Sequence, residues 1–148
     1  MIIGTFLVVG IASGYTQSAR RAEWSAYSLA AQSLAMQQME LVRASKYDPL
    51  AYNNPTNTSN PSDQLVQGNF PTILPGNANA ILDIPISGTN ITYARVTTTI
   101  TPNVGGNPLL RMVRVETVWP YLQNGNPIWQ FGNRQFTNTV VTYRGPDQ

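Results

Sequence analysis

The sequence contains no cysteine and no histidine. The absence of cysteine excludes a disulfide framework, a thiolate nucleophile and a cysteine-based zinc site. The absence of histidine removes the commonest general base and the commonest transition-metal ligand. Most catalytic and metal-binding classes of protein are therefore not indicated, and we expect neither a metal site nor a cofactor.

Charged residues are also scarce, at 11% of the chain, against roughly 25% in soluble globular proteins. The net charge is +2, and only Arg20 and Arg21 adjoin one another, so no basic stripe indicates nucleic-acid binding. The 7 carboxylates form no local pair of the kind that glycoside hydrolysis needs. We therefore expect no catalytic residues and no small-molecule substrate. The neutral polar composition is typical of a protein that packs against copies of itself or lies outside the cell.

Residues 1–47 contain no proline, and we predict that they form one long helix. Residues 1–14 form an uncharged, largely aliphatic tip of about 21 Å, shorter than the roughly 30 Å hydrocarbon core, and so a marginal membrane anchor. Residues 15–47 are rich in good helix formers, and Asp48–Pro49 ends the helix near residues 45–47. At about 70 Å the helix exceeds the diameter of a domain this small, so half of it must project.

The second half of this helix carries apolar residues on two sides. One side is predicted to hold Ala26, Leu29, Ala30, Leu34 and Leu41, and the other Ala35, Met36, Met39 and Val42. A helix that is apolar nearly all round is buried on both sides. Since no other helical segment is present to form a bundle, we expect the second side to face another molecule.

Small residues recur at every fourth position along the helix. An i±4 row of small side chains lets neighbouring helices approach closely, and Gly10 with Gly14 forms a GxxxG pattern. The alternatives are that alanine is simply common in helices and that the glycines mark a bend or local unwinding. We expect the packing of a helical core to use Phe6, Leu7, Gly10, Gly14, Ser18, Ala22, Ala26 and Ala30.

Residues 48–148 predict a β-rich head that opens with a long loop over residues 49–79. A tight turn is expected at Asn124–Gly125. Strands are expected at residues 80–87, 90–101, 109–119 and 135–144. The alternation predicts two inward rows, one of Ala94, Val96, Thr98 and Ile100, the other of Val113, Val115, Thr117 and Trp119. The fold class is therefore α+β, a long N-terminal helix packed on an antiparallel sheet of three to four strands.

One segment resembles the N-terminal helix of type IV pilin-like proteins, and it is closest to the minor-pilin and minor-pseudopilin branch. Its sequence is GYTQSARRAEWSAYSLAAQSLAMQQMELVRASKYD. The residues that carry the resemblance are 39–43, similar to that branch's ME-x-(I/L/V)-R segment, and 113–120, similar to its V-x-V-x-W strand. The resemblance implies a subunit of an extracellular helical filament that is anchored in the inner membrane before assembly, processed by prepilin peptidase and N-methylated. Thr5 stands where the family has a glutamate if Met1 is the first mature residue. Either the mature chain lacks that glutamate or it begins upstream of Met1, and we favour the second.

Several interpretations stay open. A homopolymeric filament is favoured over a minor pseudopilin of a type II secretion system, and motility, adhesion, secretion and DNA uptake share one subunit plan. A membrane-anchored adhesive module is a second interpretation, with Tyr52, Tyr121 and Trp129 able to stack on sugars. A third is a secretory signal cleaved before Tyr15.

Charges just past the apolar tip would lie inside a filament, where unpaired charge is costly. We expect Glu23 to pair with Arg20 or Arg21 of a neighbouring subunit, the alternative being a local or solvated arrangement.

Overall fold

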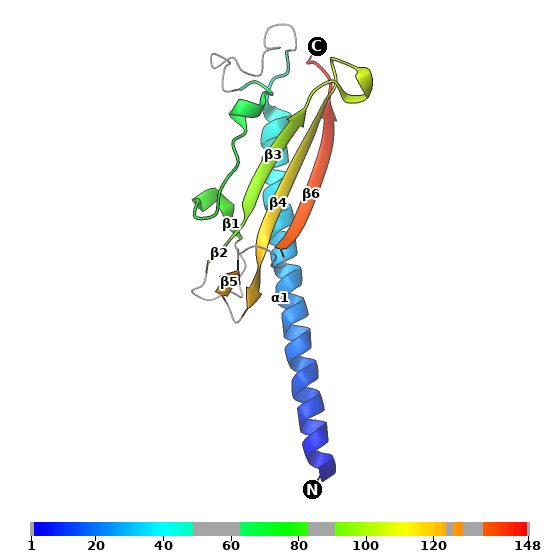
Figure 1. Ribbon diagram of the computed structural model, residues 1–148, viewed down its shortest axis with the longest axis vertical. Helices are drawn as coiled ribbons and strands as arrows, with labels where there is room; N and C mark the ends of the chain where they lie inside the picture. Colours follow the sequence, from blue (N-terminus) through cyan, green and yellow to red (C-terminus); the bar gives the residue numbers. More distant parts are fainter. Residues whose placement is uncertain (1, 49–62, 83–90, 124–125, 129–134, 148) are drawn as a thin grey trace.

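The computed structural model describes residues 2–48, 63–82, 91–123, 126–128 and 135–147. Helix α1 runs without interruption over Ile2–Ala44, which confirms the predicted end near residue 45. At about 1.5 Å per residue it is about 65 Å long. Its C-terminal half lies behind the sheet, and its N-terminal half projects beyond the head (Figure 1).

Three long antiparallel strands form the main sheet: β3 (Arg95–Thr101), β4 (Arg111–Gln123) and β6 (Gln135–Arg144). Strand β4 is central and pairs with both β3 and β6, while the short β5 (Asn126–Ile128) pairs with the end of β4. Strands β1 (Ile81–Leu82) and β2 (Thr92–Tyr93) form a separate pair. The predicted α+β class and the predicted sheet of three to four strands are confirmed.

Parts of several predictions fall outside the described residues, among them residues 49–62 of the loop and the sugar-stacking residues Tyr52, Trp129 and, for its side chain, Tyr121. The strand predicted over 80–87 is present as β1, and residues 83–90 lie outside the description. The predicted turn at Asn124–Gly125 also lies outside it, between Gln123 and Asn126, which pair with each other.

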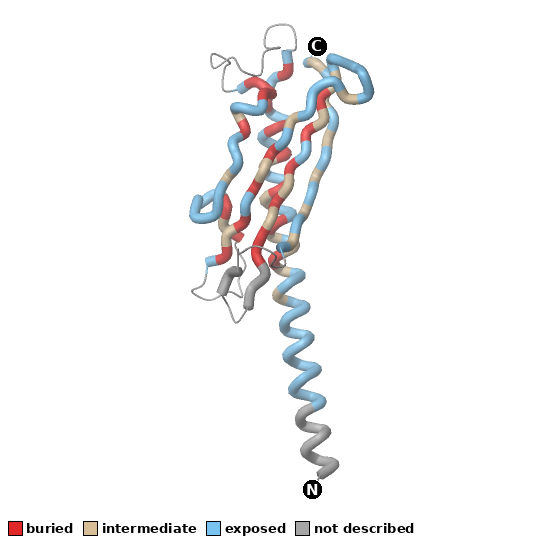
Figure 2. The backbone as a smooth tube through the Cα atoms, in the orientation of Figure 1, coloured by how far each residue is buried: buried red, intermediate tan, exposed pale blue. Residues whose placement is uncertain are grey.

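The core lies between α1 and the inner face of the sheet (Figure 2). One cluster centres on Met39, Val42, Val113 and Val115, and a second on Tyr27, Ala31 and Trp119. Both predicted inward rows are confirmed: every member is buried except Ile100, which is partly buried and packs against the first cluster. The β-branched residues of these rows suit a pleated, half-buried surface.

The predicted assignment of residues to the two sides of α1 was wrong for Met36 and Leu34. The sheet-facing side consists of Tyr27, Ala31, Ala35, Met39 and Val42. Met36, assigned to the side of Met39, is 41% exposed, and Leu34, assigned to the opposite side, packs partly against the core. The cause is the helical period: at 100° per residue, Met36 lies about 100° from Ala35 and about 60° from Met39. Leu29, at 66% exposed, and Leu41, at 57%, do lie off the sheet-facing side.

The described part of the predicted loop, residues 63–79, runs beside β3 (Figure 1). It contains short helical turns at Gln67–Asn69 and, at its end, Ala78–Ala80, and a bridge joins Ile73 to Val96. Leu65, Val66 and Phe70 are buried. A third short turn, Val104–Gly106, lies between β3 and β4, where Asn103, Gly105 and Gly106 have positive φ.

Candidate assembly surface

Residues 10–22 of α1, in the part that projects from the head, are not covered by the rest of the chain. Every residue from 10 to 22 is exposed (Figure 2), including the large side chains of Ile11 and Tyr15, at 71% and 77%. An isolated helix in water gains little from propensity alone, and most helical stability in proteins comes from tertiary packing. This segment therefore lacks, within one chain, the packing that normally stabilises a helix.

A line of exposed side chains continues from the projecting half onto the half that carries the head. Tyr15, Ala22, Leu29 and Met36 are all exposed and stand at intervals of seven residues. Seven residues complete nearly two turns with a drift of about 20°, so these residues share one side of the helix over about 32 Å. We call these four residues the outer seam. A seven-residue repeat of apolar positions is the spacing with which helices pack along one another.

Gly10 and Gly14 have no packing role within the chain. A Cβ atom built on either would meet nothing within 4 Å. Each glycine nevertheless costs a helix about 1 kcal/mol relative to alanine. The helix is regular at both positions, so the alternative that they mark a break is not observed. Among the described residues, no intramolecular contact explains their small size.

The remaining predicted packing residues divide into three groups. Ser18 and Ala22 are exposed on the projecting half, as Gly10 and Gly14 are. Ala26 and Ala30 are half-buried and pack against the head's own second cluster, so the chain already uses part of their surface. Phe6 and Leu7 lie in α1, but their side chains are outside the description.

Arg20, Arg21 and Glu23 carry the charges of the projecting half. Among the described residues, no ion pair or hydrogen bond joins any of their side chains to another group. The local pairing that was one alternative is therefore absent from the single chain. All three side chains remain available to a neighbour. Next to them Trp24 is 50% exposed, and its ring meets Phe136 edge-on at 5.9 Å between centroids.

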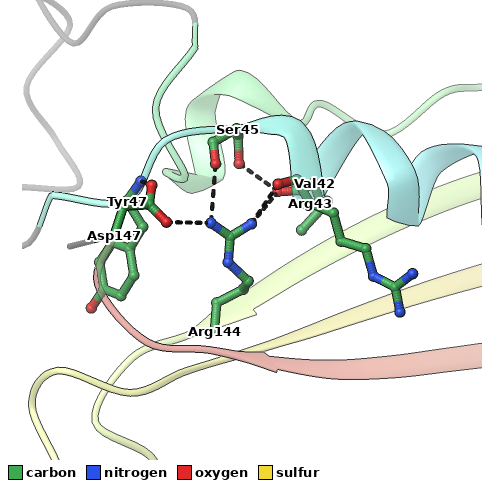
Figure 3. Close-up of polar contacts among 6 residues, drawn as sticks. All are labelled: Val42, Arg43, Ser45, Tyr47, Arg144 and Asp147. Carbon is green, nitrogen blue, oxygen red and sulfur yellow. Dashed lines mark hydrogen bonds and ion pairs between the residues drawn. The ribbon is translucent and has the colours of Figure 1, made fainter.

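A cluster of polar contacts fixes the head to the C-terminal end of α1 (Figure 3). The Arg144 guanidinium donates to the carbonyl oxygens of Val42, Arg43 and Ser45, at 3.3, 2.7 and 3.3 Å. These carbonyls belong to the helix end, where carbonyl groups lack intrahelical partners and a cation is favourable. We call Arg144, Asp147 and the helix-end groups that they contact the C-terminal clasp.

Asp147 completes the clasp from the other side of the same guanidinium. Its carboxylate accepts from the Tyr47 backbone N–H at 2.7 Å and from Arg144 at 2.8 Å. The Tyr47 N–H and, after it, the Arg144 charge lower the pKa of Asp147, because both favour the ionised form. The bonds join residues about a hundred positions apart, so they tie the last strand to the helix that carries the outer seam.

An apolar side that includes Leu29 was predicted to face another molecule, but the seven-residue line of the outer seam was not predicted, and neither was the clasp. The seam had a usable signal, the seven-residue spacing of Tyr15, Leu29 and Met36, which the search for an every-fourth-residue row overlooked. The clasp had none, because its acceptors are backbone carbonyls whose position depends on the fold.

In the part of the chain that the structure describes, no helix is long and apolar enough to cross a membrane. Within the same residues, no group of three or more acidic, cysteine or histidine side chains is placed to hold a metal ion. No protein-family model matches the sequence, and neither the curated proteins nor the solved structures contain a significant match.

Proposed function

We propose that this chain is the structural subunit of a type IV pilus-like extracellular filament, in which the α1 helices of many copies pack together in the core. The observation that carries the proposal is the outer seam, together with the bare projecting helix that it extends. Apolar side chains face solvent along both the free half of α1 and the back of the half that holds the sheet.

Burial of the outer seam supplies a driving force of useful size. A fully buried leucine contributes about 2 kcal/mol, so covering the exposed two-thirds of Leu29 is worth about 1.3 kcal/mol. Ile11 and Tyr15 expose still larger fractions and would add comparable amounts. Repeated at every subunit, such contacts favour an open array when the contact is heterologous and does not close into a ring.

A small-residue row lets the helices approach closely. Gly10, Gly14 and Ser18 present little side chain, so a neighbouring backbone can come near without a clash. The charges at Arg20, Arg21 and Glu23 would then leave water, which is costly unless they pair. An intermolecular pair between Glu23 and one arginine would neutralise two of these three charges, and among the described residues no intramolecular ion pair competes with it.

The proposal extends to the surroundings of the chain. Before assembly, subunits would be anchored in the inner membrane by the apolar tip. On assembly they would leave the membrane and join a filament at the cell surface. A helix that serves only as the stalk of an adhesive module would need no apolar residues behind its head-bearing half. For that reason Leu29 and Met36 favour the polymer over the stalk.

The test is assembly of the full chain after detergent removal, scored by sedimentation and negative-stain electron microscopy. We expect filaments of uniform width that contain only this chain. A monodisperse monomer in detergent-free buffer would contradict the proposal. Filaments that appear only when a second subunit is added would assign the chain a minor role.

A further inference from the structure

The two edge strands of the main sheet, β3 and β6, differ in whether other segments bond to their outer backbone groups. Along β3, the Gln67 side chain donates to the Thr98 carbonyl and accepts from the Ile100 N–H, both at 2.8 Å. The backbone of Ile73 exchanges two further hydrogen bonds with Val96, at 2.9 and 3.0 Å. These contacts occupy the groups with which another strand would pair, so the β3 edge is closed.

The β6 edge has none of these protections over residues 137–143. Among the described residues, the only strand that pairs with this stretch is β4. The register with β4 is regular through all its pairs, so no bulge turns the edge away. The stretch contains no proline and no charged residue. Proline, charge, bulges and covering segments are the usual means of blocking an edge, and none of them protects this stretch among the described residues.

We propose that this open edge of β6 is a docking site for an extended, uncharged segment of a different polypeptide, which adds to the sheet as a further strand. The unpaired backbone N–H and carbonyl groups of an edge are matched in full by another extended backbone. A stretch of seven residues spans about 23 Å. Its outward side chains are Thr137, Thr139, Val141 and Tyr143, and β-branched or aromatic partners pack best beside such residues.

The choice of a different polypeptide over a second copy rests on the proposed function. A β6-to-β6 contact uses the same surface on both copies and needs a two-fold axis, whereas parallel subunits of a helical filament are related by a rotation and a rise along the filament axis. Parallel neighbours would have to offer the β3 edge, which Gln67 and Ile73 close. The β6 edge of each subunit therefore stays free for a separate segment.

The edge is also held rigid, which lowers the entropy cost of binding. The Asn138 amide donates to the Ser28 carbonyl of α1 at 2.8 Å, and Arg144 binds the helix end through the C-terminal clasp. Between these two points Val140 packs against the core. Strand β6 is thus fixed to the helix on its inner side.

The probe is a fluorescein-labelled peptide with the uncharged sequence of residues 136–143, added to the full chain in detergent micelles. We expect saturable binding by anisotropy, and at least tenfold slower hydrogen exchange at the alternate amides of residues 137–143 that point to the open edge, but not at the amides of β3. The matched probe is the same peptide N-methylated at alternate residues, which should bind at least tenfold more weakly. Equal binding of both peptides, or protection outside β6, would overturn the proposal.

A pair of variants adds an internal control. The variants are Thr139→Pro and Val140→Pro, and proline has no backbone N–H. Because the N–H groups of neighbouring strand residues point to opposite edges, one variant removes a hydrogen bond to β4 and the other removes an N–H group of the open edge. The variant with unchanged thermal unfolding should lose peptide binding at least tenfold, and retained binding would count against the edge. A dimer of the chain alone, with the same amides protected, would assign the edge to a second copy and overturn the choice of partner. Filament formation is scored separately by microscopy, so either idea can fail without the other.

Discussion

Leu29→Gln separates assembly from folding most cleanly. Leu29 is 66% exposed and lies in the outer seam, while glutamine has nearly the same helix propensity as leucine. The head should therefore unfold at the same temperature as the wild type. In a filament the variant forfeits about 1.3 kcal/mol of apolar burial per subunit, which corresponds to roughly a tenfold higher critical concentration.

The assay is sedimentation of polymer from a dilution series, with the soluble concentration read at the plateau. Leu41→Gln is the matched control: the same substitution at a residue that is 57% exposed but lies about 120° around the helix from Leu29. We expect its critical concentration to change by less than twofold. Equal effects of the two variants, or none from Leu29→Gln, would refute the assignment of the outer seam.

Four further outcomes follow from the same contacts. Gly14→Leu should leave the monomer folded, because Gly14 is exposed and a Cβ atom there meets nothing within 4 Å. The variant should block assembly or change the helical rise, and Gly14→Ala should have a smaller effect; normal filaments from the leucine variant would remove the case for close packing. Glu23→Gln should lower filament yield without altering the melting temperature of the head, and unchanged yield would argue against a core ion pair. Arg144→Met should destabilise the head by about 2 kcal/mol, because the charge-assisted hydrogen bonds to the helix end are lost, and should lower the melting temperature by roughly 10 °C. Calorimetry would measure this fall, and a fall below 2 °C would show that the clasp is not stabilising. The folded-state pKa of Asp147 is lowered, so its contribution to stability should be complete above the ordinary aspartate pKa of about 3.9 and lost as pH falls through the lower folded value. The melting temperatures of the wild type and Asp147→Asn should converge at that low pH. A constant difference between them at all pH values would contradict the assignment.

Much of the head followed from local patterns. The strand at residues 135–144 was predicted at its observed bounds, because β-branched and aromatic residues are frequent in it. The inward rows of β3 and β4 were predicted from the alternation of residues along each strand, which is regular where one face is buried. Strand β4, in contrast, continues past Trp119 to Gln123, and Pro120 gave no local sign that pairing would go on.

The helix shows where sequence patterns stop being informative. Its length and end followed from composition and from Asp48–Pro49. Which of its apolar residues face the sheet depends on the rotation of the helix about its axis, and that is set by tertiary packing. Met36 was misplaced for this reason. The C-terminal clasp and the closure of the β3 edge by Gln67 depend on contacts between distant segments, which no local pattern encodes.

Helical reconstruction by cryo-electron microscopy of filaments sheared from cells tests the central claim most directly. The account predicts α1 helices in parallel at the filament centre, with Tyr15, Leu29 and Met36 against neighbouring helices and the sheets outside. Filaments held together by the heads alone, with the outer seam facing solvent, would contradict it.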